Sequence, residues 1–88
     1  MQVDNKSEEH KGFYKLDIRG KVCPMTFVYT KVELEKLKKD DILEVILDFE
    51  PALKNIPTSC ERQKLAILLK TKSINSNPKE WMLRLKRI

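Results

Sequence analysis

The feature that most constrains the fold is an apolar run near the middle of a short chain. Residues 42–49, ILEVILDF, are rich in Ile, Leu and Val, and Glu44 is the only charged residue before Asp48. A run of this kind, apolar on both faces, is typical of a strand at the centre of a sheet. A chain of 88 residues buries only a modest core, so there is room for one such centre. We therefore predict a single domain built around residues 42–49.

Helix-like segments flank this central run on both sides. Residues 24–39 begin with Pro24, continue with good helix formers and finish with lysines, which is the pattern of a helix from its first turn to its last. A second helical stretch opens at Glu50-Pro51, with Pro57 as a break or a new start inside it. The chain thus alternates between the two kinds of element.

Three further segments are typical of strands. Residues 13–18, FYKLDI, end at the turn signal Arg19-Gly20. Residues 64–74, KLAILLKTKSI, favour a strand, although so apolar a run is also compatible with a helix. Residues 80–88, EWMLRLKRI, alternate between apolar and polar after the turn sequence NSNP at 75–78, which indicates a half-buried strand.

The resulting order, β-α-β-α-β-β, predicts an α+β two-layer sandwich. Two helices would cover one face of a four-stranded mixed sheet, which closes one core from a short chain. The first β-α-β should be a right-handed parallel unit, and the last two strands should be antiparallel neighbours. We place this domain at residues 12–88 and expect the polar residues 1–11 to form a flexible tail.

Composition excludes several classes of protein. Hydrophobic residues at 41% and charged residues at 35% indicate a globular chain rather than a disordered one. No apolar run reaches the roughly 20 residues that span a bilayer, and the first residues lack the apolar core of a signal peptide. We therefore expect a cytoplasmic protein with no membrane contact, and we expect a monomer.

The formal net charge of +5 favours acidic partners, either nucleic acid or an acidic protein face. The cations are spread along the chain without interleaved aromatic residues, so we do not expect direct nucleic-acid binding. The two cysteines, Cys23 and Cys60, form no CxxC pair and should remain thiols in a reducing cytosol. The single histidine, His10, lies in the polar tail. We therefore expect no metal site, no other cofactor and no Cys-His nucleophilic pair.

Cys23 lies at the entrance of the first predicted helix, in the stretch RGKVCPMT. Unpaired N–H groups and the helix dipole stabilise a thiolate at such a position. The same residue could instead be a packed cysteine, since free cysteines are often buried. We take Cys23 as the candidate nucleophile, and the residues around it as supporting through charge, turn and helix start: Arg19, Gly20, Lys21, Pro24, Met25 and Thr26.

The stretch LDIRGKVCP, residues 16–24, resembles the signature L-D-x-R-G-x-x-C-P of the TusA/SirA-like sulfur-carrier family. DFEPALKNIP, residues 48–57, is similar to the segment that follows the second strand in that family. The resemblance implies the β-α-β-α-β-β sandwich. It also implies that Cys23 accepts sulfane sulfur as a persulfide from a cysteine desulfurase or another donor protein. An acceptor protein in tRNA thiolation, molybdenum-cofactor maturation or sulfur metabolism would then receive it, a sulfurtransferase reaction in the loose sense.

One residue departs from the family pattern, which continues C-P-x-P where this chain has Thr26. Threonine restores a backbone N–H that proline lacks and adds a hydroxyl able to bond locally. The departure leaves a second function open, a non-catalytic binding or regulatory module of the same fold. A third hypothesis, an RNA-associated accessory protein, rests only on the net charge. We interpret Cys60 as structural or incidental.

The first predicted helix carries two apolar stripes. Phe27, Thr30, Leu34 and Leu37 occupy the arc that we assign to the core. Met25 and the candidates for partner docking occupy a different arc beside Cys23, and these candidates are Val28, Tyr29 and Val32. An apolar surface next to a reactive sulfur would suit docking of a donor or acceptor protein. The alternative is a wide buried face packed against the second helix.

Overall fold

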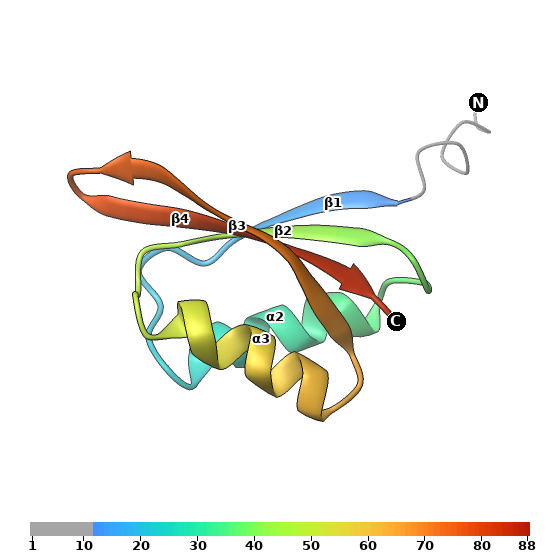
Figure 1. The fold of residues 1–88 in the computed structure, drawn as a ribbon. Helices are drawn as coiled ribbons and strands as arrows, with labels where there is room; N and C mark the ends of the chain where they lie inside the picture. The colour runs from blue at the N-terminus through green and yellow to red at the C-terminus, as the bar shows by residue number, and fades with distance from the viewer. Residues whose placement is uncertain (1–11) are drawn as a thin grey trace.

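The computed structural model describes residues 12–88 (Figure 1). The expected flexible tail at 1–11 lies outside the described residues. The elements in chain order are β1(Phe13–Asp17), α2(Met25–Glu35), β2(Ile42–Leu47), α3(Ala52–Arg62), β3(Ala66–Ser76) and β4(Lys79–Arg87). This order confirms the prediction of β-α-β-α-β-β, including a strand rather than a helix after residue 64.

The four strands form one mixed sheet in the order β1-β2-β4-β3. β1 runs parallel to β2, whereas β4 is antiparallel to both β2 and β3. Figure 1 shows α2 and α3 side by side against one face of the sheet, and no element of residues 12–88 covers the other face. The predicted two-layer sandwich is therefore confirmed, and β2 and β4 are its central strands.

The core lies between the sheet and the two helices. Alternate residues of β2, namely Leu43, Val45 and Leu47, are fully buried on the helix side, as expected for a period of two along a strand. Leu83 and Leu85 of β4 lie beside them in register and are equally buried. The helices contribute fully buried side chains that include Leu34 and Ile56.

The helix predicted at 24–39 is shorter than expected, because α2 begins at Met25 and ends at Glu35. Its last turn tightens where the Leu37 N–H donates to the Leu34 carbonyl at 3.0 Å. The Asp41 carboxylate then accepts the Lys38 N–H at 2.8 Å. Arg87 of β4 also donates from Nε to the Leu34 carbonyl at 2.9 Å, which satisfies a backbone group at the helix end.

Pro57 neither breaks nor restarts the second helix. It lies inside α3 and is buried, so packing against the sheet offsets the backbone hydrogen bond that a proline cannot make. The turn predicted at 75–78 is confined to its second half, since β3 continues to Ser76 and β4 starts at Lys79. Within residues 12–88, neither helix is long and apolar enough to cross a membrane.

Candidate functional site

The loop that carries Cys23 leaves β1 through a tight turn. The Ile18 N–H still donates to the Ile46 carbonyl of β2 at 2.8 Å, and the Lys21 N–H donates back to the Ile18 carbonyl at 3.1 Å. Gly20 occupies the third position of this turn with φ +87°, the conformation that favours glycine in a type II turn. A Cβ at Gly20 would meet no atom within 4 Å, so backbone conformation rather than space requires glycine here.

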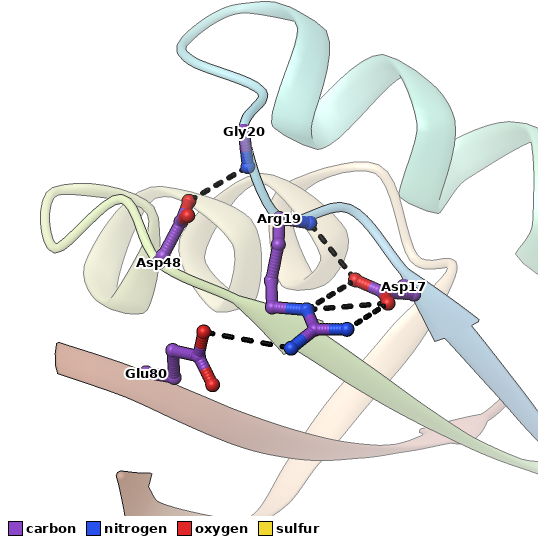
Figure 2. A network of polar contacts seen from close by, with 5 residues as sticks. All are labelled: Asp17, Arg19, Gly20, Asp48 and Glu80. Atoms are coloured by element: carbon purple, nitrogen blue, oxygen red, sulfur yellow. Dashed lines mark hydrogen bonds and ion pairs between the residues drawn. The ribbon is translucent and has the colours of Figure 1, made fainter. Parts of the chain in front are cut away.

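A hydrogen bond anchors this turn to the end of the neighbouring strand (Figure 2). The Gly20 N–H donates to Asp48 Oδ1 at 2.9 Å, and Asp48 directly follows β2. β1 and β2 are parallel, so their carboxyl ends meet at the same edge of the sheet. Asp48, which the sequence pattern at 48–57 contains without indicating its role, thus holds the turn that precedes Cys23.

Arg19 lies in an ion-pair network at the same edge. Its Nη2 is 2.7 Å from Asp17 Oδ2, and its Nη1 is 3.5 Å from Glu80 Oε2 of β4. Hydrogen bonds from the Arg19 side chain hold the pKa of Asp17 below its ordinary value, and the Asp17 carboxylate raises the pKa of Arg19. Figure 2 shows the guanidinium directed toward these two carboxylates. Two anions thus compensate the charge of Arg19, and its predicted electrostatic effect on Cys23 stays a prediction.

Cys23 is exposed and lies immediately before Pro24, the N-cap of α2. Pro24 was predicted as the first helical residue, but it lies one position earlier, because the helix begins at Met25. The Val28 N–H donates to the Pro24 carbonyl at 3.1 Å. Within residues 12–88, the N–H groups of Met25 and Phe27 make no hydrogen bond to the protein. These two groups belong to the first helical turn and are available to a negatively charged atom at the helix entrance.

Thr26 behaves differently from the expectation. Its side chain is buried, with 1% of its surface exposed, and its hydroxyl has no hydrogen-bond partner, so the expected local bond is not formed. Its N–H donates to the Val22 carbonyl at 3.2 Å and is therefore not free to serve the sulfur. One turn later, the Thr30 hydroxyl donates to the Thr26 carbonyl at 2.8 Å.

Five apolar side chains form an exposed surface beside Cys23, which we call the α2 patch. Val22 is 55% exposed, Val32 is 47% exposed, and the other three members are each 41% exposed. The complete patch consists of Val22, Met25, Val28, Tyr29 and Val32. The opposite arc of α2 enters the core, so the alternative in which α3 buries both stripes is wrong. Docking of a partner on the patch stays a prediction.

Lys21 extends over the α2 patch. Its Nζ lies 5.5 Å from the centroid of the Tyr29 ring, which is a cation–π distance. This contact connects the cysteine loop to the surface of the helix and places a positive charge at the border of the patch. Arg19 and Lys21 are the two cations predicted to support Cys23. Arg19 pairs with carboxylates, whereas Lys21 has no carboxylate partner within residues 12–88.

The second cysteine has a different environment. Cys60 is fully buried in α3, and burial, assisted by the charge of Glu61, raises the pKa of its thiol to about 12. A thiol that stays protonated and inaccessible is a poor nucleophile. Cys23 is therefore the accessible thiol of this chain.

No cluster of three or more metal-ligating side chains occurs among the residues that the structure describes.

Comparison with known proteins matches nearly the whole described chain to a single protein family. A family model described as "Sulfurtransferase TusA" matches residues 14–87. A candidate sulfur carrier protein of Archaeoglobus fulgidus is 44% identical over 72 residues, covering 82% of this chain and 78% of the relative. A candidate sulfur carrier protein of Thermotoga maritima is 34% identical over 71 residues, covering 81% and 86%.

A solved structure extends the comparison to the fold. The crystal structure of a SirA-like protein from Desulfitobacterium hafniense superposes with a TM-score of 0.61. The superposition covers 82% of this chain and 95% of the SirA-like chain, at 18% sequence identity. At this identity the likeness concerns the fold alone.

Proposed function

The chain belongs to the TusA family of sulfurtransferases, and from this premise we propose that it is a sulfur-carrier protein with Cys23 as its persulfide site. The observation that supports the proposal most directly is the exposed Cys23 thiol at the entrance of α2. It lies inside the matched region, whereas the other thiol is buried. We place this function in the single domain of residues 12–88, acting in the cytoplasm as a monomer.

The proposed reaction is a pair of thiol exchanges without net oxidation. The Cys23 thiolate attacks the outer sulfur of a donor protein's persulfide. A new S–S bond forms at Cys23 while the S–S bond of the donor breaks, and the donor leaves as a thiolate. In the second step, a thiolate of an acceptor protein attacks the outer sulfur on Cys23 and regenerates the Cys23 thiolate.

The surroundings of Cys23 suit the two anionic forms in this cycle. The free N–H groups of Met25 and Phe27 lie at the positive end of α2, where partial charges favour a thiolate or a persulfide anion. Lys21 adds a full positive charge nearby in the chain. The bond between Gly20 and Asp48 holds the turn that carries these groups. A cysteine desulfurase is the donor that we propose, with a sulfur-relay protein as the acceptor.

A second candidate function is a binding or regulatory module that keeps the fold without the transfer chemistry. The observation that favours it is Thr26, whose buried hydroxyl has no partner at the position of the second family proline. The two functions differ in one measurable property, which is sulfur loading on Cys23.

Incubation with a cysteine desulfurase and L-cysteine, followed by intact-protein mass spectrometry, separates these functions. We expect a mass increase of one sulfur atom on the wild type and on Cys60→Ser, and none on Cys23→Ser. Labelling of the native protein with iodoacetamide should likewise modify Cys23 and spare the buried Cys60. If the reduced wild-type protein accepts no sulfur while its Cys23 still reacts with iodoacetamide, the regulatory module is the correct function.

Docking on the α2 patch has its own test. Val32→Lys should slow sulfur transfer from the desulfurase by about tenfold, because one desolvated lysine in an apolar contact costs about 1.4 kcal/mol or more. The melting temperature should stay nearly constant, since Val32 is exposed. Ile74→Lys on β3 is the matched control, as Ile74 is similarly exposed but lies outside the patch. Equal rates for both variants would exclude the α2 patch as the docking surface.

A further inference from the structure

The face of the sheet that neither α2 nor α3 covers carries most of the strand cations (Figure 1). We call it the open face, with respect to the described part of the chain. Leu83 and Leu85 of β4 point to the core, so Arg84 and Lys86 lie on the other side, as strand alternation requires. Residues paired across strands share a face. The register therefore places three more lysines on this open face: Lys15 opposite Glu44, Lys70 opposite Arg84 and Lys72 opposite Met82.

The charges on the open face do not cancel. Arg84 Nη2 is 2.7 Å from Glu44 Oε2, and Lys86 Nζ is 3.5 Å from Asp40 Oδ1. Lys15, Lys70 and Lys72 make no ion pair within the part of the chain that the structure describes, and all three are exposed. The same register puts Asp17 and Glu80 on this face, where both pair with Arg19. With these two carboxylates counted, the three unpaired lysines still leave the open face positive, which favours an acidic partner. This cluster is not visible in the sequence, because β1, β3 and β4 contribute its members separately.

Apolar side chains lie among these cations. Phe13 is 51% exposed on β1, and the Arg84 guanidinium lies 5.8 Å from its ring centroid. Ile67, opposite Lys86, is 38% exposed on β3. Between the strands, Ile46 and Met82 face each other in register and are partly or largely covered. The register places these apolar residues toward the two ends of the open face, with the charged row of Lys15, Glu44, Arg84 and Lys70 between them. The open face thus presents apolar and charged side chains together.

The composition of the face distinguishes between acidic partners. Surfaces for single-stranded nucleic acid rely on several aromatic side chains on which successive bases stack, and Phe13 is the one aromatic residue that the described register places here. Aliphatic residues with lysines instead suit a polypeptide that offers carboxylates and apolar side chains together. We propose that the open face is a second docking surface, for an acidic protein segment that carries apolar side chains.

This surface and the α2 patch belong to opposite layers of the molecule. The patch lies on the solvent side of α2 in the helix layer, whereas the open face is formed by the strands alone. An acidic partner could therefore hold the protein through the sheet while Cys23 remains accessible. The proposal does not depend on sulfur transfer, because it uses none of the residues around Cys23.

Selection from a displayed library of random linear peptides tests the proposal on the full chain. Peptides that bind should be rich in Asp and Glu combined with Leu, Ile or Phe, and their affinity should fall as salt is raised. In fluorescence anisotropy, Lys70→Glu with Lys72→Glu should raise the dissociation constant by about tenfold or more, because like charges then oppose each other. Lys54→Glu with Arg62→Glu is the matched control, with the same charge change on exposed positions of α3. This control should change the dissociation constant less than about twofold.

Three outcomes would overturn the proposal. The first is that the selected peptides weaken equally with both charge variants, or weaken with Val32→Lys instead. The second is that selection on the wild-type chain, shown by circular dichroism to unfold cooperatively, yields no peptide that combines acidic and apolar residues. The third is that a single-stranded RNA of about 12 nucleotides binds more tightly than any peptide and is lost in the Lys70→Glu, Lys72→Glu variant. Because Cys23→Ser should bind the peptides as the wild type does, these outcomes are separate from the sulfur-loading result.

Discussion

At the scale of single residues, Thr26 and Thr30 form a natural comparison. Both are buried threonines on the core side of α2, one helical turn apart. The hydroxyl of Thr30 donates to a backbone carbonyl, whereas that of Thr26 has no partner. A buried hydroxyl without a partner has lost its hydration without compensation. Thr26 is therefore a local source of instability where the family pattern has an apolar ring.

We expect Thr26→Val to raise the free energy of unfolding by about 1 kcal/mol, because it replaces the unpartnered hydroxyl with a methyl group of similar shape. Thr30→Val should lower it by about 0.5–1 kcal/mol, since that change removes a formed hydrogen bond. Both substitutions keep a β-branched side chain, so helix propensity changes little. Urea unfolding of the two variants measures the contrast, and a loss of stability in Thr26→Val would contradict it.

The buried thiol of Cys60 predicts a pH dependence. Its pKa is about 12 in the folded protein, against an ordinary value of 9.0. Between these values the unfolded chain has released the proton and the folded chain retains it. The free energy of unfolding should therefore fall as pH rises above about 9, by at most about 1.4 kcal/mol per pH unit from this group.

Other groups also titrate at alkaline pH, so the comparison variant is Cys60→Ala. Urea unfolding from about pH 8 to about pH 11 should give a stability difference between wild type and Cys60→Ala that shrinks as pH rises. Parallel curves for the two proteins would mean that Cys60 does not contribute this dependence.

At the scale of elements, the loop between β1 and α2 depends on the strand next to it. The Gly20 N–H donates to Asp48 after β2, and Arg19 bridges Asp17 of β1 and Glu80 of β4. These contacts fix the position from which α2 starts. The position of Cys23 is thus determined by three strands as well as by its own helix.

Asp48→Ala should loosen this loop, because it removes the acceptor of the Gly20 N–H. A hydrogen bond to a charged group contributes about 1.5–3 kcal/mol, so amide exchange at Gly20 should accelerate by about tenfold or more. Sulfur loading on Cys23 should slow as well. Asp48→Asn retains a carbonyl acceptor and should recover most of both properties. Unchanged exchange at Gly20 in Asp48→Ala would show that the loop is held by other contacts.

The elements themselves were largely predictable from local pattern, whereas their ends and faces were not. The apolar run at 42–49 and the alternation after residue 80 each indicate a strand from neighbouring residues alone. The predicted end of α2, at residue 39, was several residues too late. The helix end is held in part by Arg87, far along the chain, which donates to the Leu34 carbonyl. The candidate site around Cys23 was recognisable from its motif, whereas the exposure of Cys23 was not. The charge cluster on the open face depends on strand register, which no local pattern specifies.

At the scale of the whole molecule, the central position of β4 dominates. β4 is last in chain order but pairs with both β2 and β3. It supplies the fully buried Leu83 and Leu85, and its Arg87 bonds to the carbonyls of Leu34 and Leu65. Sheet and helices therefore meet at this strand.

A chain that ends at Asn77 should consequently show no cooperative unfolding transition. Without β4, the strands β2 and β3 have no common partner and the core loses its central layer. A chain that starts at Gly12 is the control and should unfold cooperatively, which also tests whether residues 12–88 form the domain. Urea titration followed by circular dichroism measures both. A sharp transition in the shorter chain would show that β1, β2 and the helices form a stable unit alone.

The topology also determines when the domain can complete its fold during translation. A ribosome releases β1, α2, β2 and α3 first, yet the strand that joins them is among the last parts of the domain to emerge. Until then Cys23 belongs to an unfolded nascent chain, and its helix entrance has no sheet to hold it. The domain therefore acquires its anchored cysteine loop only after β4 has been translated, so we expect sulfur to be loaded on the completed domain rather than on a chain that still lacks β4.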